Sequence, residues 1–171
     1  MSKVVCIGDA TIDQFFFLDE ANLACDIDRE NCILGLSYGD KIAVDKVGVN
    51  VGGNAANVGV GLSRLGVETS LLTTFGDDDR AVFIKRRLLE ENVDLSMAKT
   101  AIGANSNLSA IIVYLGERTI LTYHANVEDQ IENIPVTEYI YLTSSSGRSS
   151  EKMFLKVLEF PDVKIAFNPN K

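Results

Sequence analysis

The 171-residue sequence contains a single histidine, and none of its apolar runs reaches the length of a membrane span. With one imidazole, that of His124, a histidine-rich metal site lacks ligands and a Ser-His-Asp triad has one candidate base. Asp9 and Asp13 interrupt the apolar N-terminal stretch too early for a secretory signal peptide. These absences predict a cytoplasmic protein with no membrane partner.

Cysteine is also scarce. The three cysteines are Cys6, Cys25 and Cys32, an odd number whose spacing fits no zinc-binding pattern. We therefore expect no metal site built on cysteine. Free buried thiols in a reducing compartment are the predicted state of all three.

Basic residues are the minority, because 16 Lys and Arg stand against 24 Asp and Glu, a formal net charge of -8. A nucleic-acid-binding protein usually carries a basic stripe, so no nucleic-acid partner is expected. Phosphate chemistry is still compatible with this charge, because phosphate sites use local backbone N–H donors. An apolar content of 46% over this length predicts one globular domain with a packed core.

Strand and helix patterns alternate along the chain, which predicts an α/β fold with a βαβ unit. The expected strands are residues 3–7, 47–51, 67–76, 138–144 and 162–171, with a hairpin at 109–124. The expected helices are about 54–65, capped by Gly66, and about 80–91, preceded by the capping candidates Asp78 and Asp79. The alternation is still under way at residue 171, so we expect the N-terminal portion of something longer or half of a split protein.

The stretch VGGNAANVGVGLSRLG, residues 51–66, holds the clearest candidate site. It contains no P-loop string, and no G-x-G-x-x-G follows the first strand. Gly52 and Gly53 close a strand and open a helix, so either a ligand approaches the backbone there or the helix packs tightly on the sheet. Asn54 and Asn57 each offer a donor and an acceptor to a polyol, and Asp13 could accept hydrogen bonds from two adjacent hydroxyls. Under the first alternative these residues form a pocket for a sugar-like molecule.

This stretch, followed by VETSLLTTFGDDD, resembles the first signature of the ribokinase-like (PfkB-type) carbohydrate kinases. The segments VVCIGDATIDQF, GERTIL and IAFNPN resemble the family's opening strand, a lid hairpin and a later Asn-Pro strand, in the expected order. The resemblance implies a central, mostly parallel sheet flanked by helices, with a small β lid. It places the whole chain, 1–171, in the N-terminal part of a carbohydrate kinase domain, with lid segments at about 14–45 and 105–125.

The resemblance also implies ATP-dependent phosphorylation of a hydroxyl of a small-molecule sugar, with ATP and Mg as cofactors of the full-length protein. When the family's roles are carried over by position, the sugar is expected to bind to Asp13, Gly52, Gly53 and Asn57. Asn168 is expected to face the phosphates. In many members of the family exposed lid strands pair, so a homodimer formed through the lid is expected.

One departure from the family is large. The Asp-x-x-Gly-Ala-Gly-Asp-type segment, which supplies the catalytic base and an anion hole, does not occur in the sequence. The base and the nucleotide-binding part are therefore expected beyond residue 171, and this chain alone is expected to be close to inactive. Two alternatives stay open: a non-catalytic sugar-binding or regulatory fragment, and a nucleoside (adenosine-like) kinase that uses Phe15, Phe16 or Phe17 to stack on a purine.

Overall fold

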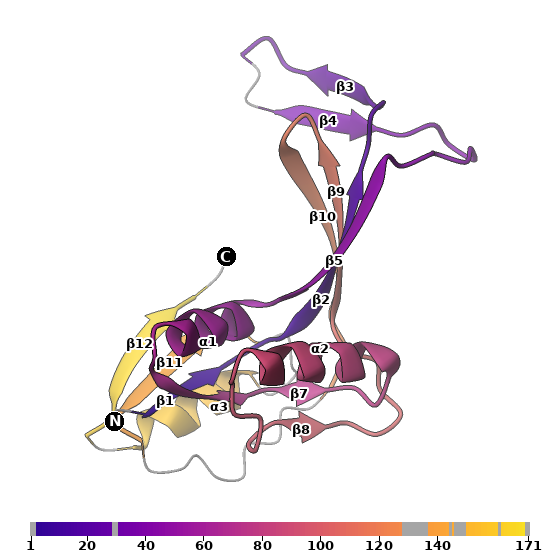
Figure 1. Cartoon of the computed structure of the whole chain (residues 1–171). Coiled ribbons are helices and arrows are strands. Elements are labelled where there is room, and N and C mark those ends of the chain that lie inside the picture. Colours follow the sequence, from indigo (N-terminus) through magenta and orange to yellow (C-terminus); the bar gives the residue numbers. More distant parts are fainter. Residues whose placement is uncertain are drawn as a thin grey trace. The chain divides into compact units, whose positions relative to one another are not determined.

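The computed structural model describes residues 3–28, 31–127, 137–143, 145, 150–160 and 162–169. The chain divides into two compact units (Figure 1), and each is described by itself. The large unit consists of Met1–Ile12, Val51–Leu108 and Tyr123–Lys171, and the small unit of Asp13–Asn50 and Ser109–Thr122. No helix of the described residues combines the length and apolarity that crossing a membrane requires.

The large unit is built on a four-stranded parallel sheet in the order β12-β11-β1-β6. Its strands are β1 (Lys3–Ile7), β6 (Glu68–Leu72), β11 (Tyr139–Thr143) and β12 (Lys164–Asn168), with a short parallel pair β7 (Thr74–Phe75) and β8 (Lys99–Thr100). Its helices are α1 (Asn54–Arg64), α2 (Asp79–Glu90) and α3 (Ser150–Leu158). This arrangement confirms the predicted α/β fold with a mostly parallel central sheet.

Helices cover both faces of this sheet. Successive residues of a strand point to opposite faces, so the contacts of neighbouring residues on β1 report on the two faces separately. Cys6 of β1 joins an apolar cluster with side chains of α1 and α2, whereas its neighbours Val5 and Ile7 join a second cluster with Val157 of α3. Nearly continuous apolar strands are typical of parallel sheets buried on two faces.

Local sequence signals set the ends of α1 and α2. After α1, Gly66 has a φ of 81°, its N–H donates to Ser63 O, and the N–H of Val67 donates to Leu62 O. This is a Schellman motif, and it confirms Gly66 as the predicted cap. At the start of α2 the Asp78 carboxylate accepts a hydrogen bond from the N–H of Ala81 at 3.0 Å, which confirms its predicted capping role.

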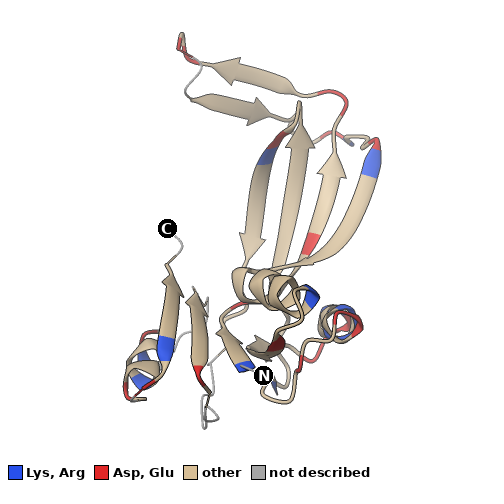
Figure 2. Ribbon diagram, turned by 60° about the vertical axis from the view of Figure 1, so that its left-hand side comes forward, with Lys and Arg blue, Asp and Glu red and all other residues tan. Residues whose placement is uncertain are grey.

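The small unit contains a four-stranded sheet in the order β10-β9-β2-β5 and a separate two-stranded ribbon. The sheet strands are β2 (Thr11–Phe17), β5 (Lys46–Gly52), β9 (Leu108–Tyr114) and β10 (Glu117–Tyr123), and the ribbon consists of β3 (Asn22–Cys25) and β4 (Cys32–Gly35). Both ribbon strands are uncharged, and acidic residues lie beyond their ends (Figure 2). Thr11 and Ile12 at the start of β2 are buried and belong to the large unit. Among the described residues of Asp13–Asn50 and Ser109–Thr122, Ile111 is the one side chain that is buried.

The cysteines differ from the prediction of three free buried thiols. Cys25 and Cys32 are exposed and form a disulfide across the ribbon, and only Cys6 is a free buried thiol. The prediction was wrong for this pair because the two cysteines become neighbours only when β3 and β4 align antiparallel, and their spacing alone does not reveal that register.

Candidate functional site

The start of α1 is held tightly against the turn that follows β1. Gly53 is the N-cap of this helix and has a φ of 91°, a conformation that side-chain-bearing residues rarely adopt. A Cβ at this position would lie 2.4 Å from the backbone oxygen of Asp9 and 2.8 Å from the Cα of Ala10. A glycine is therefore required at residue 53 by contact with the protein's own backbone.

This packing places the beginning of α1 at the carboxyl end of β1. Because β1, β11 and β12 are parallel, Asn168 at the end of β12 lies at the same edge of the sheet. Strands two positions apart are separated by about 10 Å. The structure therefore brings Gly53 and Asn168 to one edge, the edge at which open α/β sheets bind ligands.

Two further predicted residues flank Gly53. Gly52 is buried as the last residue of β5, and Asn57 is exposed in the first turn of α1, where its backbone N–H donates to Gly53 O at 2.9 Å. Within the part of the chain that the structure describes, the side-chain amide of Asn57 makes no hydrogen bond to protein. Its donor and acceptor groups therefore face solvent at the mouth of the helix.

Asn168 is held in place by two neighbouring side chains. Its amide nitrogen donates to the hydroxyl of Tyr141 at 3.1 Å, and the hydroxyl of Thr143 donates to its backbone oxygen at 3.0 Å. The residue is exposed at the end of an outer strand of the sheet.

Asp13 is the predicted residue that belongs to the other unit. It lies half-buried on β2, within the small unit, whereas Gly52, Gly53 and Asn57 belong to the large unit. The grouping of the Asp13 carboxylate with those three residues stays a prediction.

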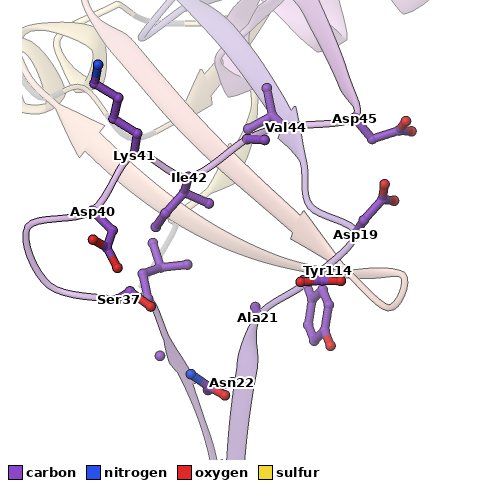
Figure 3. Close-up of a pocket in the computed structure, with 14 residues that line it drawn as sticks. Asp19, Ala21, Asn22, Ser37, Asp40, Lys41, Ile42, Val44, Asp45 and Tyr114 are labelled. Carbon is purple, nitrogen blue, oxygen red and sulfur yellow. The ribbon is translucent and has the colours of Figure 1, made fainter.

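The small unit contains a cavity of about 770 Å³ that none of the predicted site residues lines. Figure 3 shows Ser37 and Asp40 on one side of it and Asp19 and Tyr114 on the other. Its walls come from the ends of the ribbon strands and from the segment leading into β5. No local motif marks such a cavity, because its walls meet only once the ribbon has formed.

The lining of this cavity is acidic. Four carboxylate residues contribute to it, against one lysine, Lys41; they are Asp19, Glu20, Asp40 and Asp45. Such a surface repels phosphate groups and accepts hydrogen bonds from neutral hydroxyls or cationic groups. The cavity is therefore unsuited to a nucleotide.

The GDDD segment at 76–79 stabilises the fold by packing and hydrogen bonding against residues 104–106. A Cβ on Gly76 would lie 2.4 Å from the oxygen of Ala104, and the Asp78 carboxylate accepts hydrogen bonds from the N–H and the hydroxyl of Ser106 at 2.9 and 2.7 Å. Partial burial opposes ionisation of Asp78, but the hydrogen bonds from Ser106 and Ala81 outweigh it and hold the pKa below its ordinary value. This segment ties the start of α2 to the loop before β9.

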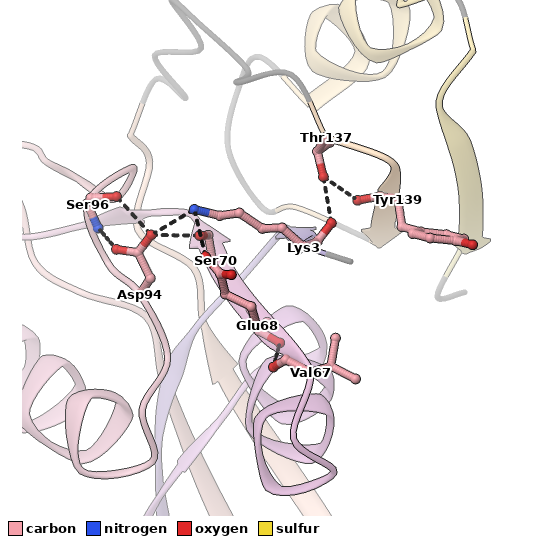
Figure 4. A network of polar contacts seen from close by, with 9 residues as sticks. Lys3, Val67, Glu68, Ser70, Asp94, Ser96, Thr137 and Tyr139 are labelled. Carbon is pink, nitrogen blue, oxygen red and sulfur yellow. Dashed lines mark hydrogen bonds and ion pairs between the residues drawn. The ribbon is translucent and has the colours of Figure 1, made fainter. Parts of the chain in front are cut away.

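A second polar network lies near the start of β1 (Figure 4). The Asp94 carboxylate accepts hydrogen bonds from the hydroxyl of Ser70 at 2.7 Å, from the N–H of Ser96 at 2.9 Å and from the ammonium of Lys3 at 3.4 Å. Partial burial would raise the pKa of Asp94, but these hydrogen bonds outweigh it and lower the pKa to about 2. Lys3 is the first residue of β1, whereas Gly53 packs beyond the opposite end of that strand, so we assign this network to stability.

Comparison with known sequences gives a family. The pfkB family carbohydrate kinases match residues 1–160 of this chain. The uncharacterized sugar kinase YegV of Escherichia coli (strain K12) is 35% identical over 92 residues, which are 54% of this chain and 28% of that protein.

Solved structures give the fold. The ribokinase of Cryptococcus neoformans var. grubii serotype A in complex with ADP matches with a TM-score of 0.74 and 18% identity, over 99% of this chain and 50% of that one. The nucleoside kinase of Methanocaldococcus jannaschii matches with a TM-score of 0.74 and 17% identity, over 98% of this chain and 52% of that one. The chain has the ribokinase fold, and it spans about half the length of these two structures.

Proposed function

The chain belongs to the pfkB family of carbohydrate kinases, and we propose that it carries the sugar-binding part of a kinase that phosphorylates a sugar hydroxyl with ATP. The observation that carries this proposal is the start of α1. There Gly53 holds the helix against the end of β1, and Asn57 exposes an unused amide at the ligand-binding edge of a parallel sheet.

Each residue of this site has a chemical role in the proposal. The amide of Asn57 donates a hydrogen bond to one sugar hydroxyl and accepts one from another, and the carboxylate of Asp13 accepts hydrogen bonds from two adjacent hydroxyls. Gly52 and Gly53 form a wall of the pocket without side chains. A neutral polyol suits this set of groups, because nothing in it demands a charge on the guest.

The nucleotide and Mg²⁺ need more groups than these residues provide. Among the described residues, no three His, Cys, Asp or Glu side chains cluster closely enough to hold a metal ion. We propose that the side chain of Asn168 faces the phosphates of the nucleotide. A single uncharged amide is not enough to bind a nucleotide. When bound, ATP supplies the phosphoryl group and Mg²⁺ offsets its negative charge. The catalytic base and the anion hole come from outside residues 1–171, so the chain alone turns over little.

Isothermal titration calorimetry of the purified chain against a panel of pentoses, hexoses and nucleosides tests the binding half of this proposal. We expect a sugar to bind and Asn57→Ala to weaken that binding by roughly tenfold, the effect of losing about one good hydrogen bond. Gly61→Ala is the matched control, because it adds a methyl group to the same helix where nothing lies within 4 Å.

The outcomes separate the alternatives. Equal sugar affinity in the wild type and Asn57→Ala would remove Asn57 from the site. Ordinary turnover of sugar and ATP by the chain alone would contradict the assignment of the base to other polypeptide. Sugar binding that never leads to phosphorylation, even with a complete family member's C-terminal half added, would favour the non-catalytic sugar-binding fragment.

A nucleoside kinase is the second candidate. Phe15 and Phe17 lie on one face of β2 with ring centroids 6.5 Å apart and planes inclined by 24°, which gives the small unit an aromatic surface for a purine. The same calorimetric panel decides between a sugar kinase and a nucleoside kinase. If the protein is a nucleoside kinase, adenosine should bind more tightly than ribose, and Phe15→Leu should abolish this difference in affinity.

The small unit is the lid of this kinase in our proposal, and the lid forms the homodimer contact. Val47 and Val49 of β5 and Ile120 and Leu121 of β10 are exposed apolar side chains on its sheet. Sedimentation velocity should show a dimer that Val49→Lys dissociates, while Val82→Lys, at an exposed valine of α2, leaves it intact. A wild-type monomer at every concentration would contradict the dimer.

A further inference from the structure

The disulfide of the small unit joins residues that face each other directly across the β3–β4 ribbon. Cys25 is paired with Cys32 in the antiparallel register, and their Cα atoms are 4.1 Å apart. At the next pair, the N–H of Asp26 donates to the oxygen of Asn31 at 3.0 Å. Hydrogen-bonded and non-hydrogen-bonded pairs alternate along such a ladder, so the cysteines occupy a non-hydrogen-bonded pair, in which the two backbones approach most closely.

Among the described residues, the ribbon is held by this bond, by its antiparallel strand pairing and by contacts at its turn. It has only two strands of four residues, and none of their side chains is buried. Two-stranded hairpins of this kind are marginally stable in water. At the turn the Asp26 carboxylate accepts hydrogen bonds from the backbone and side chain of Asn31, but these are exposed and therefore weak.

The ribbon also forms part of the acidic cavity. Ala21 and Asn22 at the start of β3, and Gly35, Leu36 and Ser37 at the end of β4, belong to its walls. We propose that the Cys25–Cys32 disulfide is a reversible redox switch, which keeps the ribbon paired and the cavity formed when oxidised and releases both when reduced. This inference is independent of the kinase assignment, because it concerns only contacts within the small unit.

The chemistry is thiol–disulfide exchange with a dithiol reductant. A reductant thiolate attacks one exposed sulfur of the pair, the Cys25–Cys32 bond breaks, and a mixed disulfide forms. The second reductant thiol resolves the mixed disulfide, so two electrons and two protons pass to the cysteines and the reductant leaves as a disulfide. Burial raises the pKa of the Cys6 thiol to about 12, so Cys6 stays protonated and takes no part in the exchange.

Counting free thiols tests the first step. Denatured protein alkylated without reductant should take one iodoacetamide label, on Cys6, and after dithiothreitol it should take three. Addition of glutathione disulfide to the reduced native protein should restore the single label. Three labels in protein that has been treated with glutathione disulfide would overturn the proposal.

Hydrogen exchange followed by mass spectrometry tests the consequence. In peptides covering Asn22–Cys25 and Cys32–Gly35, reduction should speed amide exchange at least roughly tenfold, while peptides of α1 and α2 stay unchanged. The double variant Cys25→Ser/Cys32→Ser should exchange like the reduced protein with or without dithiothreitol. Cys6→Ala, the matched cysteine control, should keep the full redox response, and equal exchange of the ribbon in both redox states would overturn the switch.

Discussion

The large unit buries side chains on both faces of its parallel sheet, whereas the small unit buries one, Ile111, among its described residues. Burial of apolar surface is the main favourable term in folding. The large unit is therefore stabilised by its own apolar core. The small unit depends on its strand pairing, its cross-strand contacts and one disulfide, which makes it the part of the molecule that a partner or a redox change can alter most easily.

Among the described glycines, the two most tightly confined ones lie in the large unit. In the large unit a Cβ on Gly53 or Gly76 would lie 2.4 Å from a backbone oxygen, so these positions tolerate no side chain. In the small unit a Cβ on Gly48 would make ordinary contact with Phe15 at 3.6 Å. A Cβ on Gly39 would meet nothing within 4 Å, although the φ of 79° there is itself unfavourable for a side chain. The large unit therefore fixes the backbone of the candidate site at Gly53.

The largest expected difference between the units comes from removing a core side chain. Phe75 is fully buried in the large unit, so Phe75→Ala should lower the free energy of unfolding by about 3–5 kcal/mol. Ile33 of the ribbon is 71% exposed, and Ile33→Ala should change it by less than about 0.5 kcal/mol. Urea unfolding followed by circular dichroism measures both, and similar losses would break the contrast.

Gly53→Ala is expected to lower the free energy of unfolding by roughly 2–4 kcal/mol, because the new Cβ meets the Asp9 oxygen and the positive φ is itself strained. Gly61→Ala in the same helix has open space around it and should stabilise the protein by about 0.5–1 kcal/mol. Thermal unfolding of the two variants should give shifts of the midpoint temperature in opposite directions. A gain in stability in Gly53→Ala would show that the turn after β1 can move away.

Loss of the α2 cap should have a smaller effect. Asp78→Ala removes the acceptor of the Ala81 N–H and of both Ser106 hydrogen bonds, and should cost about 1–2 kcal/mol. Asp79→Ala, at the next position and exposed, should cost no more than about 0.5 kcal/mol. Urea midpoints that fall equally for both variants would assign the effect to helix charge instead of the cap.

The smallest expected effect is a pH dependence carried by Asp94. The pKa of Asp94 in the folded protein is about 2, below its ordinary value of 3.8. Its contribution to the free energy of unfolding is therefore complete above pH 3.8 and disappears as the pH falls toward 2. The carboxylate is partly exposed, and solvent screening limits that contribution to about 1 kcal/mol. Urea unfolding at pH 5, 3 and 2 should show a shallower loss in Asp94→Asn than in the wild type, and parallel curves would assign the loss to other carboxylates.

Much of the large unit could be predicted because its signals are local. The helix expected over 54–65 is Asn54–Arg64, and the helix expected over 80–91 is Asp79–Glu90, each with a cap that the sequence marks. The strand expected over 67–76 forms as two strands, Glu68–Leu72 and Thr74–Phe75, because the chain changes pairing partner between them.

The small unit could be predicted far less well. The run Phe15–Phe17 has no alternation of polar and apolar residues, so it did not mark the strand β2 that contains it. The ribbon strands are four residues long, and their pairing depends on a register that spacing does not reveal. The acidic cavity and the disulfide follow from that pairing, and neither was predicted.

By itself the sequence determined the α/β class, both well-capped helices of the βαβ region and the family, because periodicity, caps and the glycine-rich motif act over a few neighbouring residues. Tertiary structure alone decided what the glycine at residue 53 contacts, which two of the three cysteines pair and where a cavity forms. Each of these depends on segments that are separate along the chain and meet only after strands have aligned. No local pattern can encode such a meeting, because it depends on the register and packing of both partners.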